Sequence, residues 1–92
     1  MNDFFLALND LEKTNSWNDD CGYTFIHRGI SELMSRDVQL LFQLLYRIDV
    51  KESLVKEVFQ HSEQPDHIIH ELTLLIIERL KQKAEIRRNY SS

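Results

Sequence analysis

Glycine and proline are scarce in this chain, and that scarcity limits the folds it can adopt. The 92 residues include two glycines and one proline. The tight turns of a many-stranded sheet depend on such residues, because glycine reaches positive φ and proline pre-sets the turn. A helical chain needs far fewer of them. We therefore expect an all-α protein, a small bundle of about four helices with a long irregular connection between the first two.

The composition fits one globular unit. The chain is 42% hydrophobic and 28% charged, close to the averages for globular proteins. We expect residues 1–92 to form a single all-helical domain with a polar C-terminal tail at about 88–92. No uncharged run approaches the roughly 20 residues that span a membrane, and MNDFFLALNDLEK carries acids where a secretory signal carries bases. These features predict a cytoplasmic protein that has no membrane segment.

Hydrophobic residues recur at helical spacing in four segments. In the first segment, Phe4, Leu8 and Leu11 lie on one face of a helix. Residues 14–29 lack such spacing and include several turn-forming residues, so we expect them to form the irregular connection. The predicted helices are at about 3–13, 31–48, 50–60 and 65–88.

Polar residues mark where two of these helices begin. In the sequence DVKE, Asp49 can accept a hydrogen bond from the first turn of the third helix while Glu52 reaches back, as in a capping box. Pro65 suits the first turn of the fourth helix, because its missing N–H would have no helical partner there. The second and third helices are then joined by a very short link, and we expect them to meet at a sharp corner or pack antiparallel.

Two charged residues fall close to the expected apolar faces. Asp37 projects about 40° from the centre of the apolar stripe of the second helix, and Arg79 lies between apolar residues of the fourth. An unpaired charge in a core is costly, so buried charges are normally paired. One hypothesis is a partly buried pair formed by Asp37 with Arg79 or with Arg47. The alternative is that Ser35 caps a helix and Asp37 interacts with the dipole of its first turn.

The sequence PDHIIHE contains four weak candidates for metal ligands, namely Asp66, His67, His70 and Glu71. A metal would require further ligands from elsewhere in the chain, and a lone HxxH on a helix is not a specific signal. His67 and Glu71 are one helical turn apart and can simply pair with each other. We therefore expect no metal and no cofactor. A metal- or ligand-responsive accessory domain that uses this region is the alternative function.

No catalytic or nucleic-acid-binding motif is evident. The chain has no glycine-rich phosphate loop, no GxSxG and no HExxH. Its single cysteine, Cys21, can form neither an internal disulfide nor a zinc-binding thiolate pair. A formal net charge of −4 gives no electrostatic reason to expect a nucleic-acid partner. We expect that the protein is not an enzyme.

The predicted helices carry more apolar surface than one small bundle needs. The fourth helix is apolar over roughly 200° of its circumference, with Ile77 on one flank and Leu74 on its polar side, and Phe42 and Tyr46 lie beyond the stripe of the second helix. Such helices are either central in a bundle or covered by a partner. We expect protein–protein interaction, chiefly self-association as a two-fold homodimer with these four residues at its interface. The alternatives are another protein partner, or cover by the aromatic residues of segment 14–29.

Overall fold

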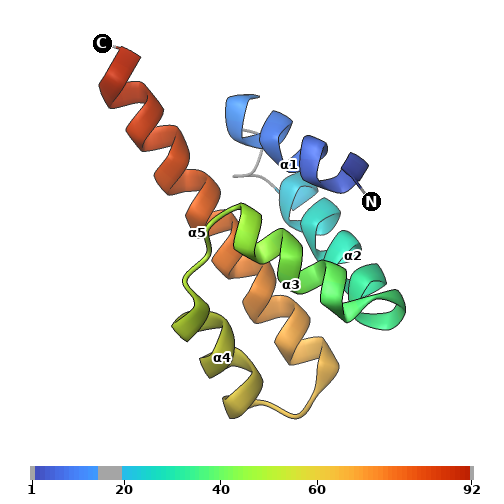
Figure 1. Cartoon of the computed structure of the whole chain (residues 1–92). Helices are drawn as coiled ribbons and strands as arrows, with labels where there is room; N and C mark the ends of the chain where they lie inside the picture. Colours follow the sequence, from blue (N-terminus) through green and yellow to red (C-terminus); the bar gives the residue numbers. More distant parts are fainter. Residues whose placement is uncertain (1, 15–19, 92) are drawn as a thin grey trace.

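The computed structural model describes the backbone of residues 2–14 and 20–91, and most of their side chains. This part of the chain forms five α-helices and contains no strand, so the all-α expectation is confirmed (Figure 1). Five helices replace the four that were expected. They are α1 (Asn2–Thr14), α2 (Asp20–Arg36), α3 (Val38–Arg47), α4 (Glu52–His61) and α5 (Pro65–Ser91).

Helix α5 is the centre of the bundle. It packs against α2, α1 and α4, and its last turns project beyond the other helices (Figure 1). The helix continues to Ser91, so the end predicted at about residue 88 was too early. Its buried residues share one face, as the helical period requires. They are Ile68, Ile69, Leu72, Thr73, Ile76, Leu80 and Ala84.

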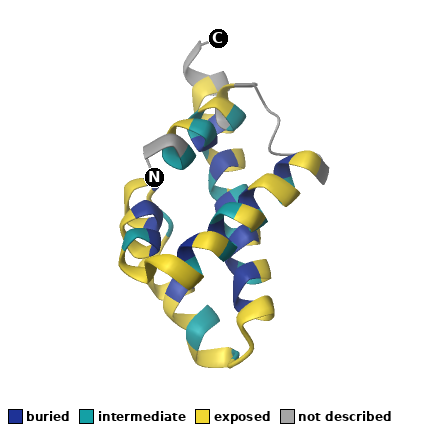
Figure 2. Cartoon of the chain, turned by 90° about the vertical axis from the view of Figure 1, so that its right-hand side faces the viewer, coloured by how far each residue is buried: buried dark blue, intermediate teal, exposed yellow. Residues whose placement is uncertain are grey.

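All five helices contribute to one hydrophobic core. Figure 2 shows the buried residues gathered on the inward sides of the helices, with exposed residues outside. Burial of such side chains is the main favourable term in folding, about 1.5–3 kcal/mol for each one that is fully buried. The most deeply buried residues outside α5 are Leu8, Ile26, Ile30, Leu41 and Ile48.

The expectation of an irregular connection at residues 14–29 is largely wrong. Asp20 and the residues after it belong to α2, while residues 15–19 lie outside the part of the chain that the structure describes. Gly29, which was read as a turn former, instead allows α1 to approach α2 closely. The ring of Phe4 lies against it, and a Cβ at this position would clash with that ring. The glycine therefore serves helix packing and does not break the helix.

The single helix predicted at 31–48 is divided at Asp37. This residue has φ −156° and ψ 87°, and its carboxylate accepts a hydrogen bond from the backbone N–H of Leu40 at 3.1 Å. Asp37 is exposed and is the N-cap of α3. The alternative of a helix start in this region is therefore closer to the structure than a buried charge, although the cap is Asp37 and not Ser35. The buried pair that was predicted between Asp37 and Arg79 or Arg47 is not present.

Replacing Asp37 with Ala should lower the free energy of unfolding by about 1 kcal/mol, because it removes the N-cap hydrogen bond of α3. Asp37→Asn should retain most of the stability, since asparagine caps a helix nearly as well as aspartate. Chemical denaturation measures both, with Glu57→Ala as a matched exposed acid. A loss for Asp37→Ala no larger than that for Glu57→Ala would show that the cap contributes nothing.

Candidate functional site

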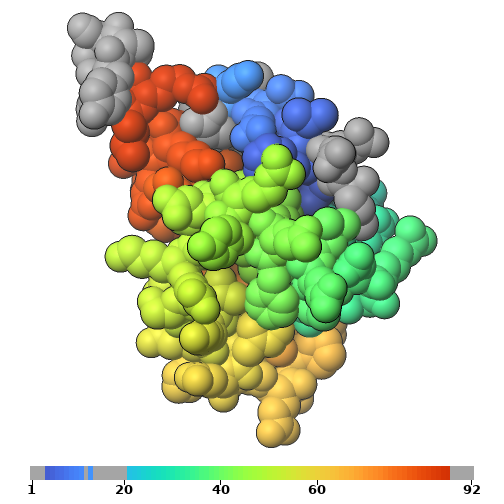
Figure 3. Space-filling view, in the orientation of Figure 1, coloured from blue at the N-terminus to red at the C-terminus, as the bar shows by residue number. Residues whose placement is uncertain are grey.

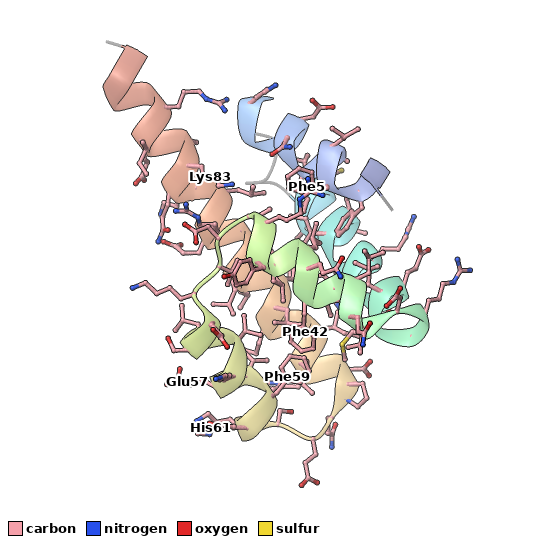
Figure 4. All side chains as sticks on the ribbon, viewed as in Figure 1. Phe5, Phe42, Glu57, Phe59, His61 and Lys83 are labelled. Carbon is pink, nitrogen blue, oxygen red and sulfur yellow. The ribbon has the colours of Figure 1, made fainter. Side chains whose placement is uncertain are left out.

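Helices α3 and α4 lie next to each other on one face of the molecule. Figure 1 shows α4 returning in roughly the opposite direction to α3, and both helices face the viewer in Figure 3. The rings of Phe42 and Phe59 meet between them, with centroids 5.5 Å apart and planes tilted by 42° (Figure 4). Tilted aromatic pairs at this separation are favourable. The two rings therefore join α3 to α4 near the molecular surface.

The outward side of α3 carries a row of exposed apolar residues. Val38, Phe42 and Tyr46 are spaced four residues apart and lie along one side of the helix. Their exposed fractions are 42%, 44% and 81%. The inward side of the same helix is also apolar and supplies the buried Leu41, Leu44 and Leu45. We call the exposed row the α3 stripe, and it is apolar surface that the core does not use.

A hollow of about 550 Å³ lies beside the α3 stripe, between α3 and α4. Three apolar side chains, Phe42, Val55 and Phe59, line it together with polar residues from α4. Two of the polar residues, Glu52 and Lys56, form an exposed ion pair at 3.4 Å. The third is Gln60. We call this feature the α3–α4 hollow, an open apolar surface with one acid and one base beside it.

Two of the four residues predicted for an interface lie on this face. Phe42 lines the hollow and belongs to the α3 stripe, and Tyr46 is the most exposed residue of that stripe. Ile77 is only partly exposed and packs against the hydrophobic core. Leu74 is exposed, but it lies on a different side of the molecule.

The position of Leu74 follows from its neighbours on α5. It comes one helical turn after His70, whose Nδ1 lies 2.6 Å from the Tyr23 hydroxyl of α2. Leu74 therefore lies on the outward side of α5, nearer to the α2 edge of the helix than to the α4 edge. The side that faces α4 is marked by Leu75, which lines a second hollow together with Leu54. The structure does not bring Leu74 together with the α3 stripe.

Three residues of this face were not identified from the sequence as part of an interface. Val38 could have been found, because it lies one helical turn before Phe42 on the same side of the helix. Val55 and Phe59 belong to α4, and their place beside Phe42 depends on how the two helices pack. No local pattern in the sequence specifies that contact.

Arg79 is a partly buried cation, but its partner is not the predicted one. Its side chain is 22% exposed, and Nη2 lies 3.3 Å from Oδ2 of Asp49, whose side chain is 85% exposed. Its Nε donates a hydrogen bond to the backbone carbonyl of Ile48 at 3.0 Å, and its Nη1 donates to Oε1 of Gln82 at 3.3 Å. The guanidinium thus holds the end of α3 against α5. The pair of Asp37 with Arg79 is not formed.

Asp49 also differs from its predicted role as a helix cap. Helix α4 begins at Glu52, and its N-cap is Lys51, which makes no side-chain capping bond. Asp49 has φ 66°, a left-handed conformation that aspartate adopts more readily than most residues. Glu52 pairs with Lys56 and does not reach back toward Asp49. Asp49 therefore helps to reverse the chain between α3 and α4.

Arg47, the other cation considered for Asp37, contacts α1 instead. Its guanidinium lies 4.6 Å from the centre of the Phe5 ring, which Figure 4 labels on α1. Such a cation–π contact contributes about 0.5–1 kcal/mol at exposed sites. Neither of the two arginines meets Asp37, and each one instead fastens α3 to a neighbouring helix.

The candidate metal ligands at the start of α5 do not form a cluster. Nε2 of His67 lies 3.7 Å from Oε1 of Glu71, and His70 contacts Tyr23 of α2. Asp66 lies in the first turn of the helix, where the helix dipole favours a negative charge. Among the described side chains, no group of three or more His, Cys, Asp or Glu residues could hold a metal ion.

Comparisons with known proteins give no match: neither a family model, nor a curated protein, nor a solved structure is significantly similar to this chain. In the described residues, no helix has the length and apolar character needed to cross a membrane. The α3–α4 face, which consists of the α3 stripe and the α3–α4 hollow, combines a row of three exposed apolar side chains with a hollow beside it.

Replacing Arg79 with Gln should lower the free energy of unfolding by about 1–3 kcal/mol, because the carbonyl of Ile48 loses its donor in a partly buried place. Asp49→Asn should cost less than about 1 kcal/mol, since an exposed carboxylate contributes little to an ion pair. Chemical denaturation at low and high salt compares the two variants. An equal or larger loss for Asp49→Asn would mean that the ion pair, and not the hydrogen bond to α3, is the main contribution.

Proposed function

We propose that this protein acts through protein–protein association and that its partner is a second copy of the same chain. The observation that carries the proposal is the α3 stripe, an apolar row on the outward side of a helix whose inward side already packs in the core. Single exposed apolar residues are ordinary on protein surfaces, but a contiguous patch commonly marks an interaction site. Tyrosine is also enriched among the residues that dominate binding energy. We assign the chain no catalytic role.

The charges beside the stripe favour a second copy as the partner. In a two-fold dimer the same patch meets itself, so the patch must be compatible with its own charges. Glu52 and Lys56 balance each other, and contact between two such patches can place acid against base. The C-terminal half of α5 is less suitable, because its bases outnumber its acids and would meet the same excess of bases in another copy.

We expect the wild-type protein to be a dimer in solution at micromolar concentrations, as measured by light scattering. Tyr46→Ser should raise the dissociation constant by about 10-fold or more, the equivalent of about 1.4 kcal/mol. The variant should remain folded, because the Tyr46 side chain is largely exposed. Circular dichroism checks this directly.

Leu74→Ser is the control for the loss of an exposed apolar side chain, because Leu74 is exposed but lies near the α2 edge of α5, away from the α3 stripe. It should leave the dissociation constant unchanged. A wild-type protein that stays monomeric throughout would contradict the proposal. Dissociation caused by Leu74→Ser but not by Tyr46→Ser would place the interface on α5 and remove the α3 stripe from it.

A further inference from the structure

We infer that in the dimer Tyr46 of each copy inserts into the α3–α4 hollow of the other copy. This inference rests on the proposed self-association and specifies the contact that produces it. Tyr46 has the largest exposed fraction of the large apolar side chains among the described residues. It lies one helical turn beyond Phe42 along the α3 stripe and does not line the hollow of its own chain. The projecting ring and the hollow are therefore neighbours on one face.

The hollow suits an aromatic side chain in both size and chemistry. Its volume of about 550 Å³ leaves room for a tyrosine ring, and Phe42 and Phe59 offer aromatic surfaces for tilted or offset contacts. A buried tyrosine also needs a partner for its hydroxyl. Glu52 and Gln60 line the same hollow, and each carries a side-chain oxygen that can accept this hydrogen bond.

Two-fold symmetry makes the contact reciprocal. An isologous interface requires one patch that is complementary to itself, and a patch with a projecting ring beside a hollow meets that requirement. A two-fold axis that passes between Tyr46 and the hollow places the Tyr46 ring of each copy in the hollow of the other copy. The assembly then closes at two copies, with no free hollow left to recruit a third. The competing arrangement stacks the two Tyr46 rings on each other at the axis and leaves both hollows unfilled.

Mixing two defective variants distinguishes these arrangements. Tyr46→Ala removes the ring, and Phe59→Ala removes one wall of the hollow. Each variant alone should associate with a dissociation constant raised by about 10-fold or more, because both reciprocal contacts are damaged. A mixed dimer keeps one contact intact, in which Tyr46 of the Phe59→Ala chain enters the complete hollow of the Tyr46→Ala chain. Its other contact pairs the two defects.

The mixed dimer should therefore be tighter than either variant dimer. We assume that a contact is lost when either its ring or its hollow is damaged, so the mixed dimer keeps one of the two contacts. The dissociation constant of the mixed dimer should then lie near the geometric mean of the wild-type and variant values, apart from a statistical factor of about two. Sedimentation velocity with one variant fluorescently labelled measures this constant. A mixture of Tyr46→Ala with Tyr46→Ser is the control, because neither chain has a ring and no rescue is expected.

Gln60→Trp gives a second way to damage the hollow if Phe59→Ala does not fold. Gln60 is exposed, so a larger side chain can be placed there without disturbing the core, and it should block the hollow from its polar side. This variant should also be rescued by mixing with Tyr46→Ala. A wild-type dimer whose variants show no rescue in either mixture would overturn reciprocal insertion while leaving self-association intact. A monomeric wild-type protein would overturn both.

Discussion

The apolar face of α5 is the constraint on which the rest of the structure depends. Its buried residues extend along the helix from Ile68 to Ala84, and α1, α2 and α4 pack against it. Helix α3 packs mainly against α2 and reaches the core from that side. The inward side of α3 completes the core, and none of the other four described helices covers its outward side. The exposed α3 stripe is thus a consequence of an arrangement in which α1, α2 and α4 pack against α5 while α3 packs mainly against α2.

The fold class could be predicted from the sequence because glycine and proline are rare and apolar residues recur at helical spacing. The division of the predicted second helix could not be predicted, because the sequence around Asp37 fits either a helix N-cap or a charge on the apolar face. Segment 14–29 was misread for a related reason. Gly29 is a turn former by propensity, but the approach of Phe4 gives it a packing role inside a helix. A local capping bond decided the first case, and a tertiary contact that single-sequence patterns do not contain decided the second.

The candidate site was only partly visible in the sequence. Phe42 and Tyr46 could be identified because they fall outside the apolar stripe of their own helix. Phe59 could not be assigned to the same surface, because its contact with Phe42 crosses between two helices. Arg79 was recognised as a cation in an apolar setting, but its hydrogen bond to the carbonyl of Ile48 depends on the corner between α3 and α4. Arg79 holds that corner, and the corner positions α4 beside α3.

In the proposed dimer, the α3–α4 faces of two copies meet. The most direct measurement is an isotope-filtered nuclear Overhauser experiment on a mixture of labelled and unlabelled chains, which detects only contacts between different chains. We expect intermolecular contacts from the Tyr46 ring to the Val55 methyl groups and the Phe59 ring. Intermolecular contacts confined to Leu74 and its neighbours on α5 would contradict association through the α3–α4 face. The absence of any intermolecular contact, at concentrations where all of the wild-type protein is dimeric, would contradict it as well.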